Sequence, residues 1–168
     1  ASILVRYGET AVLCNVTASK TPREGIDYFP LSVDFDEKLY SVGKIPGSFP
    51  RREGRPTDRA ILDSRVIDRP MRPLFPKDMR NDCAVVMSAM SVDPDYSYCM
   101  CGMLGASMAV AISDVPWNGP IAGCEVGLVD GEIILNPTAE QDAKSDLHLI
   151  VSSTDKKVVM IEAGANEV

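Results

Sequence analysis

The chain has 168 residues, of which 45% are hydrophobic and 24% are charged, so it is long enough for one ordinary hydrophobic core but not for two. Its net charge of -7 and isoelectric point near 4.7 exclude a general nucleic-acid coat or a membrane-surface protein. No apolar run is long enough to span a membrane, and the five cysteines form an odd, scattered set, so we expect a soluble cytoplasmic protein with free thiols.

The first 35 residues are predicted to contain three β-strands. Segments rich in Val, Leu, Ile and Thr run over Ser2–Tyr7 and Thr10–Ser19, and they are separated by a Gly-Glu turn. Apolar and other residues then alternate along Tyr28–Phe35, which predicts a third strand with one buried face. We expect these strands to form an antiparallel sheet.

Residues 41–56 cannot form regular structure, because three glycines and three prolines interrupt them. They are expected to form a long ordered loop. Thr57 follows as an N-cap residue, with Asp58 favourably placed in the first helical turn. The sequence therefore predicts a helix over Asp58–Asp68, which ends before Pro70.

The middle of the chain predicts a buried strand over Cys83–Val92 and a second helix that runs to about Ser113. Asp93 is the expected N-cap of this helix, and Pro94 is allowed in a first turn. Glycine, alanine and serine occupy much of the helix surface, and methionine and leucine occupy most of the rest. Such a helix is expected to be buried and closely approached by its neighbours.

The last third predicts a hairpin and two further strands. Cys124–Val129 and Glu132–Leu135 flank an Asp-Gly pair, which is typical of a tight β-hairpin turn. Strands are also expected at Leu147–Val151 and Val158–Glu162. The order of elements predicts an α+β fold, in which a mixed β-sheet packs against two main helices.

Basic charge is concentrated in one segment. Eight of the ten arginines lie between Arg51 and Arg80, and this window of residues carries a net charge of +4, which leaves -11 on the remainder. A polyanion would therefore be attracted to this segment alone. Arginine also fits phosphate oxygens with two parallel hydrogen bonds, so recognition of phosphate or carboxylate groups is expected here.

The predicted first helix places Arg65 and Arg69 on the same side as Ile61 and Leu62. A guanidinium on a partly buried face must be paired with an acid or with a bound anion. We favour intramolecular ion pairs for Arg65, Arg69 and nearby Arg72, and contact with a bound anion is the alternative.

The loop before this helix carries Phe49 beside Arg51, Arg52 and Arg55. An aromatic ring next to arginines is the combination that holds single-stranded nucleic acid, because the ring stacks on a base while the cations bind the backbone. The alternative is that these charges are only solvated, as many loop charges are.

Long stretches of the sequence resemble the first core domain of bacterial polynucleotide phosphorylases, and together they extend over essentially the whole chain. The matching stretches are GKIPGSFPRREGRPTDRAILDSRVIDRPMRPLFP (43–76), DVPWNGPIAGCEVG (114–127), ILNPT (134–138) and VMIEAGANEV (159–168). The resemblance implies a fold of the ribonuclease PH type. It also implies that residues 1–168 are a first core domain that is truncated at both ends.

In this family, inorganic phosphate attacks the 3′-terminal phosphodiester of RNA and releases nucleoside diphosphates. The resemblance implies Mg²⁺ and phosphate as cofactor and co-substrate, single-stranded RNA and a second core domain as partners, and a homotrimeric ring. It places the metal and the chemistry in the second core domain, which carries small hydroxyl residues at the start of the helix that corresponds to residues 96–113. Here those positions are Ser97, Tyr98 and Cys99, and His148 stands where the second core domain has a catalytic Asp.

We therefore predict no catalytic and no metal-binding residue in this chain. Asp146 lies two residues before His148 and is not the matching position. Cys99 and Cys101 would face apart on a helix, so they are interpreted as buried thiols and not as metal ligands.

The family's constriction loop, two aromatics followed by two arginines, falls on Phe49, Pro50, Arg51 and Arg52. The second aromatic has become proline, which removes one stacking contact. We expect Phe49, Arg51, Arg52 and Arg55 to bind RNA. Two rival interpretations are a non-catalytic, exosome-type ring subunit and a stand-alone enzyme that uses Ser97 and Asp146.

Overall fold

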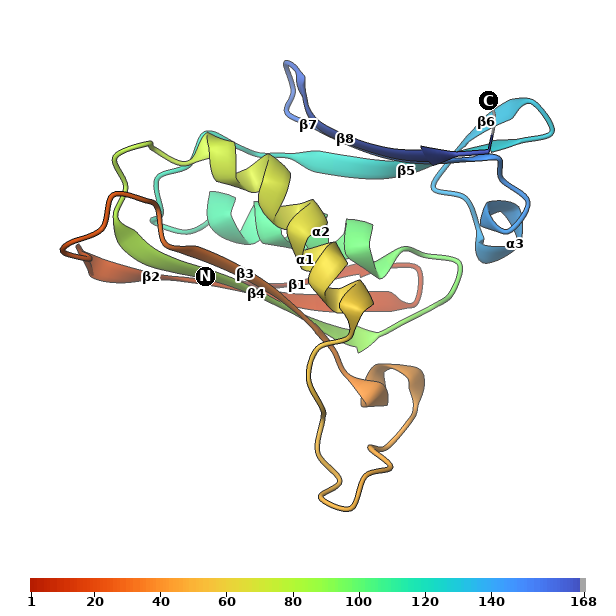
Figure 1. Cartoon of the computed structure of the whole chain (residues 1–168), viewed down its shortest axis with the longest axis horizontal. Helices are drawn as coiled ribbons and strands as arrows, with labels where there is room; N and C mark the ends of the chain where they lie inside the picture. Colours follow the sequence, from red (N-terminus) through yellow and green to blue (C-terminus); the bar gives the residue numbers. More distant parts are fainter. Residues whose placement is uncertain (167–168) are drawn as a thin grey trace.

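Two four-stranded sheets enclose a layer of helices in the computed structural model, which describes residues 1–166 (Figure 1). The first sheet has the strand order β1 (Ser2–Tyr7), β2 (Thr10–Pro22), β4 (Asn81–Ser91) and β3 (Leu31–Glu37). The second has the order β6 (Glu132–Leu135), β5 (Ala122–Val129), β7 (Leu147–Ser153) and β8 (Val158–Ala165). The main helices are α1 (Asp58–Met71) and α2 (Tyr98–Ala111), and the short ones are η1 (Leu39–Val42), η2 (Arg72–Leu74) and α3 (Ala139–Asp142).

The first sheet is mixed, so the expectation of an antiparallel N-terminal sheet was wrong for β3. Strands β1, β2 and β4 pair antiparallel, whereas β3 pairs parallel to β4, with Val33 opposite Val85 and Phe35 opposite Met87. The chain between β3 and β4 contains a loop and helix α1, and such a crossover connection brings the next strand back in the same direction. Strand β3 also begins at Leu31 and not at Tyr28, directly after Pro30, which has no N–H to donate.

The second sheet is antiparallel throughout and contains the predicted hairpin. Asp130 and Gly131 have φ values of 52° and 82°, as a two-residue turn of this kind requires. The α+β fold with a mixed sheet and two main helices is thus confirmed. The sequence did not predict that the last third of the chain forms a separate sheet on the other side of the helices.

Helix α1 has the predicted cap but a different exposed face. The Ala60 N–H donates to the Thr57 hydroxyl at 3.0 Å. The helix continues to Met71 because Pro70 falls in its last turn, where the missing N–H costs a single hydrogen bond and the ring itself is buried. Ile61 and Leu62 are 47% and 56% exposed, so the prediction that the arginines share a partly buried face was wrong.

Helix α2 is buried between the two sheets, as its composition predicted. Its N-cap is Ser97, whose hydroxyl accepts the Met100 N–H at 3.3 Å, and not Asp93. Asp93 caps a preceding turn instead, because its carboxylate accepts the Asp95 N–H at 3.1 Å. The Cβ of an alanine at position 105 would lie 2.4 Å from the Cys14 Sγ, so the helix and β2 approach as closely as glycine permits.

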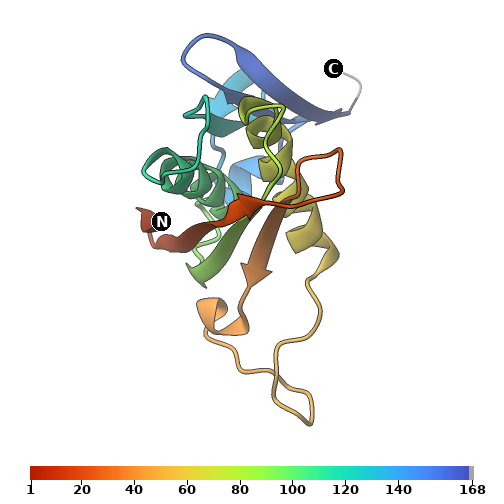
Figure 2. The ribbon, with the colours of Figure 1, turned by 90° about the vertical axis from the view of Figure 1, so that its left-hand side faces the viewer.

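The segment between η1 and α1 extends away from the layers as a long loop, which both views show at the end of the molecule (Figures 1 and 2). It contains residues 43–57 and is the predicted glycine- and proline-rich loop. Among the described residues, no helix combines the length and the apolar character that crossing a membrane demands.

Candidate nucleic-acid interface

The tip of this loop displays an aromatic ring next to two cations. The Arg51 N–H donates to the Ser48 carbonyl at 2.8 Å, which closes a turn with Phe49 and Pro50 in its centre. Arg51 has a φ of 48°, and Pro50 holds its own φ near the value that its ring allows. Phe49 is fully exposed and touches no core residue, and the side chains of Arg51 and Arg52 are exposed as well. The apolar ring therefore remains available to a ligand.

The arginine-rich segment divides into paired and unpaired members. Arg69 contacts Glu162 at 3.1 Å, and Arg72 contacts Asp68 at 2.8 Å and also donates to the Leu31 carbonyl at 3.1 Å. These two are structural, as one of our alternatives proposed. Within residues 1–166, no ion pair is formed by Arg51, Arg52, Arg55 or Arg65. The intramolecular ion pair that we favoured for Arg65 is therefore wrong, because its side chain is exposed and the fold brings none of the described acids to it.

The loop is held at its base by hydrogen bonds to its own ends. The Glu53 carboxylate accepts the Leu39 N–H at 3.0 Å, which ties the returning limb to η1. The Val92 N–H donates to the Ser41 carbonyl at 3.1 Å, which ties η1 to the end of β4. The Thr57 hydroxyl donates to the Glu37 carboxylate, so the start of α1 is joined to the end of β3. These hydrogen bonds hold the base of the loop in place, and the tip residues extend from it.

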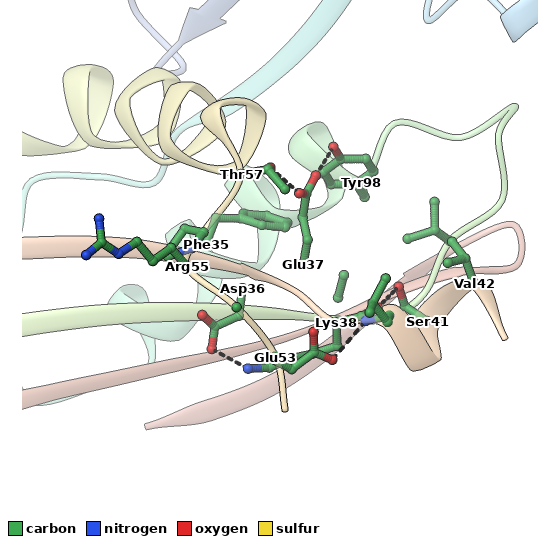
Figure 3. A pocket seen from close by; sticks show the side chains of 15 residues that line it. Phe35, Asp36, Glu37, Lys38, Ser41, Val42, Glu53, Arg55, Thr57 and Tyr98 are labelled. Atoms are coloured by element: carbon green, nitrogen blue, oxygen red, sulfur yellow. Dashed lines mark hydrogen bonds and ion pairs between the residues drawn. The ribbon is translucent and has the colours of Figure 1, made fainter. Parts of the chain in front are cut away.

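A pocket of about 400 Å³ lies at this base, between the end of β3, η1, the returning limb of the loop and Tyr98 of α2 (Figure 3). Arg55 belongs to its lining, so the structure separates Arg55 from the tip residues Phe49, Arg51 and Arg52. In Figure 3 the Arg55 side chain extends away from Glu37 and Glu53. All four predicted site residues therefore lie on one loop, but Arg55 lies at its base and the other three lie at its tip.

The start of α2 is occupied by the chain's own groups. The Ser97 hydroxyl donates to the Glu125 carboxylate at 2.6 Å, and the Tyr98 hydroxyl donates to the Glu37 carboxylate at 2.6 Å. The Arg59 guanidinium lies over the Tyr98 ring, 5.2 Å from its centre. Two carboxylates thus take the hydroxyl donors that an incoming anion would need.

Further negative charge surrounds this helix start. The Asp63 Oδ2 is buried without a hydrogen-bond partner, and its nearest cation is the Arg59 Nε at 3.9 Å. Burial raises the pKa of Asp63, and the charge of Arg59 offsets part of that effect. The pKa of the Cys99 thiol is also raised, first by burial and then by the charges of Asp63 and Glu125. The carboxylates of Glu37 and Glu125 would repel an anion placed at this helix start.

The stand-alone enzyme hypothesis needs a free Ser97 hydroxyl beside Asp146. The Ser97 hydroxyl instead donates to the Glu125 carboxylate. Asp146 joins strand ends, because its N–H donates to the Leu128 carbonyl at 2.9 Å. The His148 Nδ1 lies 3.5 Å from the Asp142 Oδ1 on the surface. In residues 1–166, no three His, Cys, Asp or Glu side chains gather in a way that could hold a metal ion.

Sequence reasoning missed the roles of Glu37 and Glu53. Glu37 accepts from both Thr57 and Tyr98, and Glu53 anchors the loop. Glu53 lies among arginines in the sequence, where an acidic residue is readily interpreted as compensating their positive charge. Only the fold brings the end of β3 beside the start of α1, so no local pattern could have found the Glu37 contacts.

Comparison with known proteins agrees with this architecture. Residues 1–116 match the sequence family described as 3′ exoribonuclease family, domain 1, and residues 119–168 match domain 2 of the same family. The chain belongs to the 3′ exoribonuclease family. The resemblance found in the sequence is thereby confirmed, together with its ribonuclease PH-like fold.

Individual members of the family are highly similar to this chain. It is 59% identical over 165 residues to the polyribonucleotide nucleotidyltransferase of Ruminiclostridium cellulolyticum, and 63% identical over 164 residues to that of Lachnoclostridium phytofermentans. These alignments cover 98% of this chain and 24% of each relative, so the chain spans about a quarter of their length. The crystal structure of rice (Oryza sativa) Rrp46 covers 100% of the chain with a TM-score of 0.76 at 12% identity, which supports the fold alone.

Proposed function

We propose that this chain guides RNA and builds the ring of a polyribonucleotide nucleotidyltransferase, an enzyme that uses phosphate to shorten RNA from its 3′ end and releases nucleoside diphosphates. The observation that carries the proposal is the loop tip, where exposed Phe49 stands beside Arg51 and Arg52 without intramolecular partners in residues 1–166. The ring stacks on a base, and the two guanidinium groups bind the phosphates on either side of it.

The chain itself is proposed to be catalytically silent. Glu125 and Glu37 already accept the hydroxyls of Ser97 and Tyr98, so the start of α2 offers carboxylates where phosphate would need donors. Within the described residues, no three His, Cys, Asp or Glu side chains gather as possible metal ligands. In line with the family resemblance, we propose that phosphate attack, and any metal that supports it, belong to a second core domain outside this chain.

The remaining partners follow from the same assignment. We propose a homotrimeric cytoplasmic protein in which this first core domain and the second one alternate around a channel for single-stranded RNA. Sequence identities near 60% to polyribonucleotide nucleotidyltransferases support this assignment over an exosome-type ring subunit, for which the support is a shared fold at 12% identity.

Replacement of the tip residues in the intact protein tests the proposal. Arg51→Ala with Arg52→Ala should weaken binding of a single-stranded oligoribonucleotide by at least about tenfold at low salt. The slope of log affinity against log salt concentration should become shallower by about 1.4, because each lost phosphate contact removes about 0.7 from this slope for single strands. Affinity for inorganic phosphate should be unchanged, and equal loss of both affinities would contradict the guiding role.

Phe49→Ala separates stacking from charge in the same assay. It should cost about 1–3 kcal/mol of RNA binding, because one base loses its stacking partner, and it should leave the salt slope unchanged. Tyr28→Ala is the matched control, since Tyr28 is also an exposed aromatic, at 59%, but precedes β3 and lies outside the loop. Equal losses from the two variants would contradict a specific role for Phe49.

A further inference from the structure

The pocket at the base of the loop has a largely apolar lining and enough volume to admit one flat aromatic ring. Its apolar walls come from β3, η1, the end of β4 and the start of α2, and they are formed by Phe35, Leu39, Val42, Ala89, Val92 and Tyr98. Its volume of about 400 Å³ falls in the range of small-molecule sites.

The charged groups around the pocket are satisfied except for one cation. Asp36 is paired with Lys38 at 3.2 Å, Glu53 accepts the Leu39 N–H, and Glu37 accepts two hydroxyls. Arg55 forms no ion pair with any described residue and is exposed at the rim. A ligand with an apolar body and an anionic group beside it suits this lining, and a nucleotide has that composition.

Glu37 gives the pocket a means of distinguishing bases. Its two oxygens are fixed by the hydroxyls of Tyr98 and Thr57, and each carboxylate oxygen retains a further lone pair. Tyr98 is itself held between Phe35, with ring centres 5.4 Å apart, and the Arg59 guanidinium. An anchored carboxylate of this kind favours a base with an amino group over uracil, because the single N3–H donor of uracil lies between two carbonyl oxygens that the carboxylate repels.

We propose that this pocket receives one unstacked nucleobase of the RNA strand that the loop tip guides, with Arg55 on the adjoining phosphate and Glu37 on the amino group of an adenine, guanine or cytosine. The inference rests on the proposed guiding function and adds a second, base-selective contact to it. Arg55 follows Arg51 by four residues, so their Cα atoms are at most about 14 Å apart and their side chains can bind phosphates of one strand.

An abasic scan of a short oligoadenylate tests the pocket in the intact protein. Removal of the base at one position should weaken binding about tenfold, since stacking of one base is lost. Val42→Trp, on the exposed rim of the pocket, should fill the space, weaken binding of unmodified RNA by a similar factor and abolish the effect of that abasic position. Val158→Trp is the matched control, because Val158 is 54% exposed against 51% for Val42 and lies in the other sheet.

Base identity provides a second readout that does not depend on filling the pocket. Uracil at the sensitive position should weaken binding to the wild-type protein, and Glu37→Gln should reduce this discrimination. A scan with the same profile in the wild-type and Val42→Trp proteins would overturn the inference. If Arg51→Ala with Arg52→Ala leaves RNA affinity intact, the guiding function fails. If the double arginine variant loses affinity but the abasic scans of the wild-type and Val42→Trp proteins have the same profile, only the proposed nucleobase pocket is refuted.

Discussion

Individual arginines in this chain differ in role according to the acids that the fold brings near them. Arg69 and Arg72 meet Glu162 and Asp68, and these pairs are half-exposed, so each adds little to stability. Arg51 and Arg52 meet no acid among the described residues because the loop tip projects away from the layers. The sequence predicted the importance of the tip from residue type, but Glu162 lies 93 residues beyond Arg69, and no local pattern connects them.

Asp63 gives a prediction about pH. Its raised pKa means that the folded chain keeps a proton that the unfolded chain loses, so the free energy of unfolding falls as pH rises from the ordinary carboxyl pKa near 3.8 through the higher folded value. Asp63→Asn removes this fall. The variant should therefore gain stability relative to wild type as pH rises above about 3.8, until the folded pKa is passed, as measured by denaturant unfolding at each pH. A difference that is flat, or that shrinks with pH, would contradict a desolvated carboxyl.

At the scale of elements, short sequence signals were reliable where the local chain decides the structure. The Thr57 cap and the Asp-Gly turn are formed as predicted, because their hydrogen bonds and φ values involve adjacent residues. The direction of β3 and the end of α1 at Met71 depend on the crossover and on burial of Pro70, which are tertiary effects. The pocket could not be predicted for the same reason, since four separate elements form it.

Close packing of α2 against β2 gives a prediction about stability. Gly105→Ala should destabilise the chain by about 1–3 kcal/mol, because its Cβ would lie 2.4 Å from the Cys14 Sγ and 3.1 Å from the Val5 Cγ2. Better helix propensity would return only about 1 kcal/mol of this cost. Denaturant unfolding of the single and double variants measures the change. In a Cys14→Ala background the cost should be clearly smaller, and an unchanged cost would exclude this contact as the cause.

For the whole molecule, the division between guidance and chemistry can be tested with the chain alone. Residues 1–168 are expected to release no ADP from poly(A) in the presence of phosphate and Mg²⁺, whereas the intact protein should do so. The physical reason is the pair of carboxylates that already accept the hydroxyls of Ser97 and Tyr98. Circular dichroism establishes that the isolated chain is folded, and phosphate-dependent turnover by the folded chain would refute the silent assignment.

The position of α2 between the sheets has a consequence for how the chain acquires its structure. The two family matches meet near residue 117, yet the helix presents buried side chains to both sheets, and the Ser107 hydroxyl accepts the Ile121 N–H at 2.9 Å across that junction. A polypeptide ending at residue 116 would leave one side of an almost wholly apolar helix in water. The two matched portions are therefore expected to melt in a single cooperative transition, and neither would persist as an autonomous folding unit.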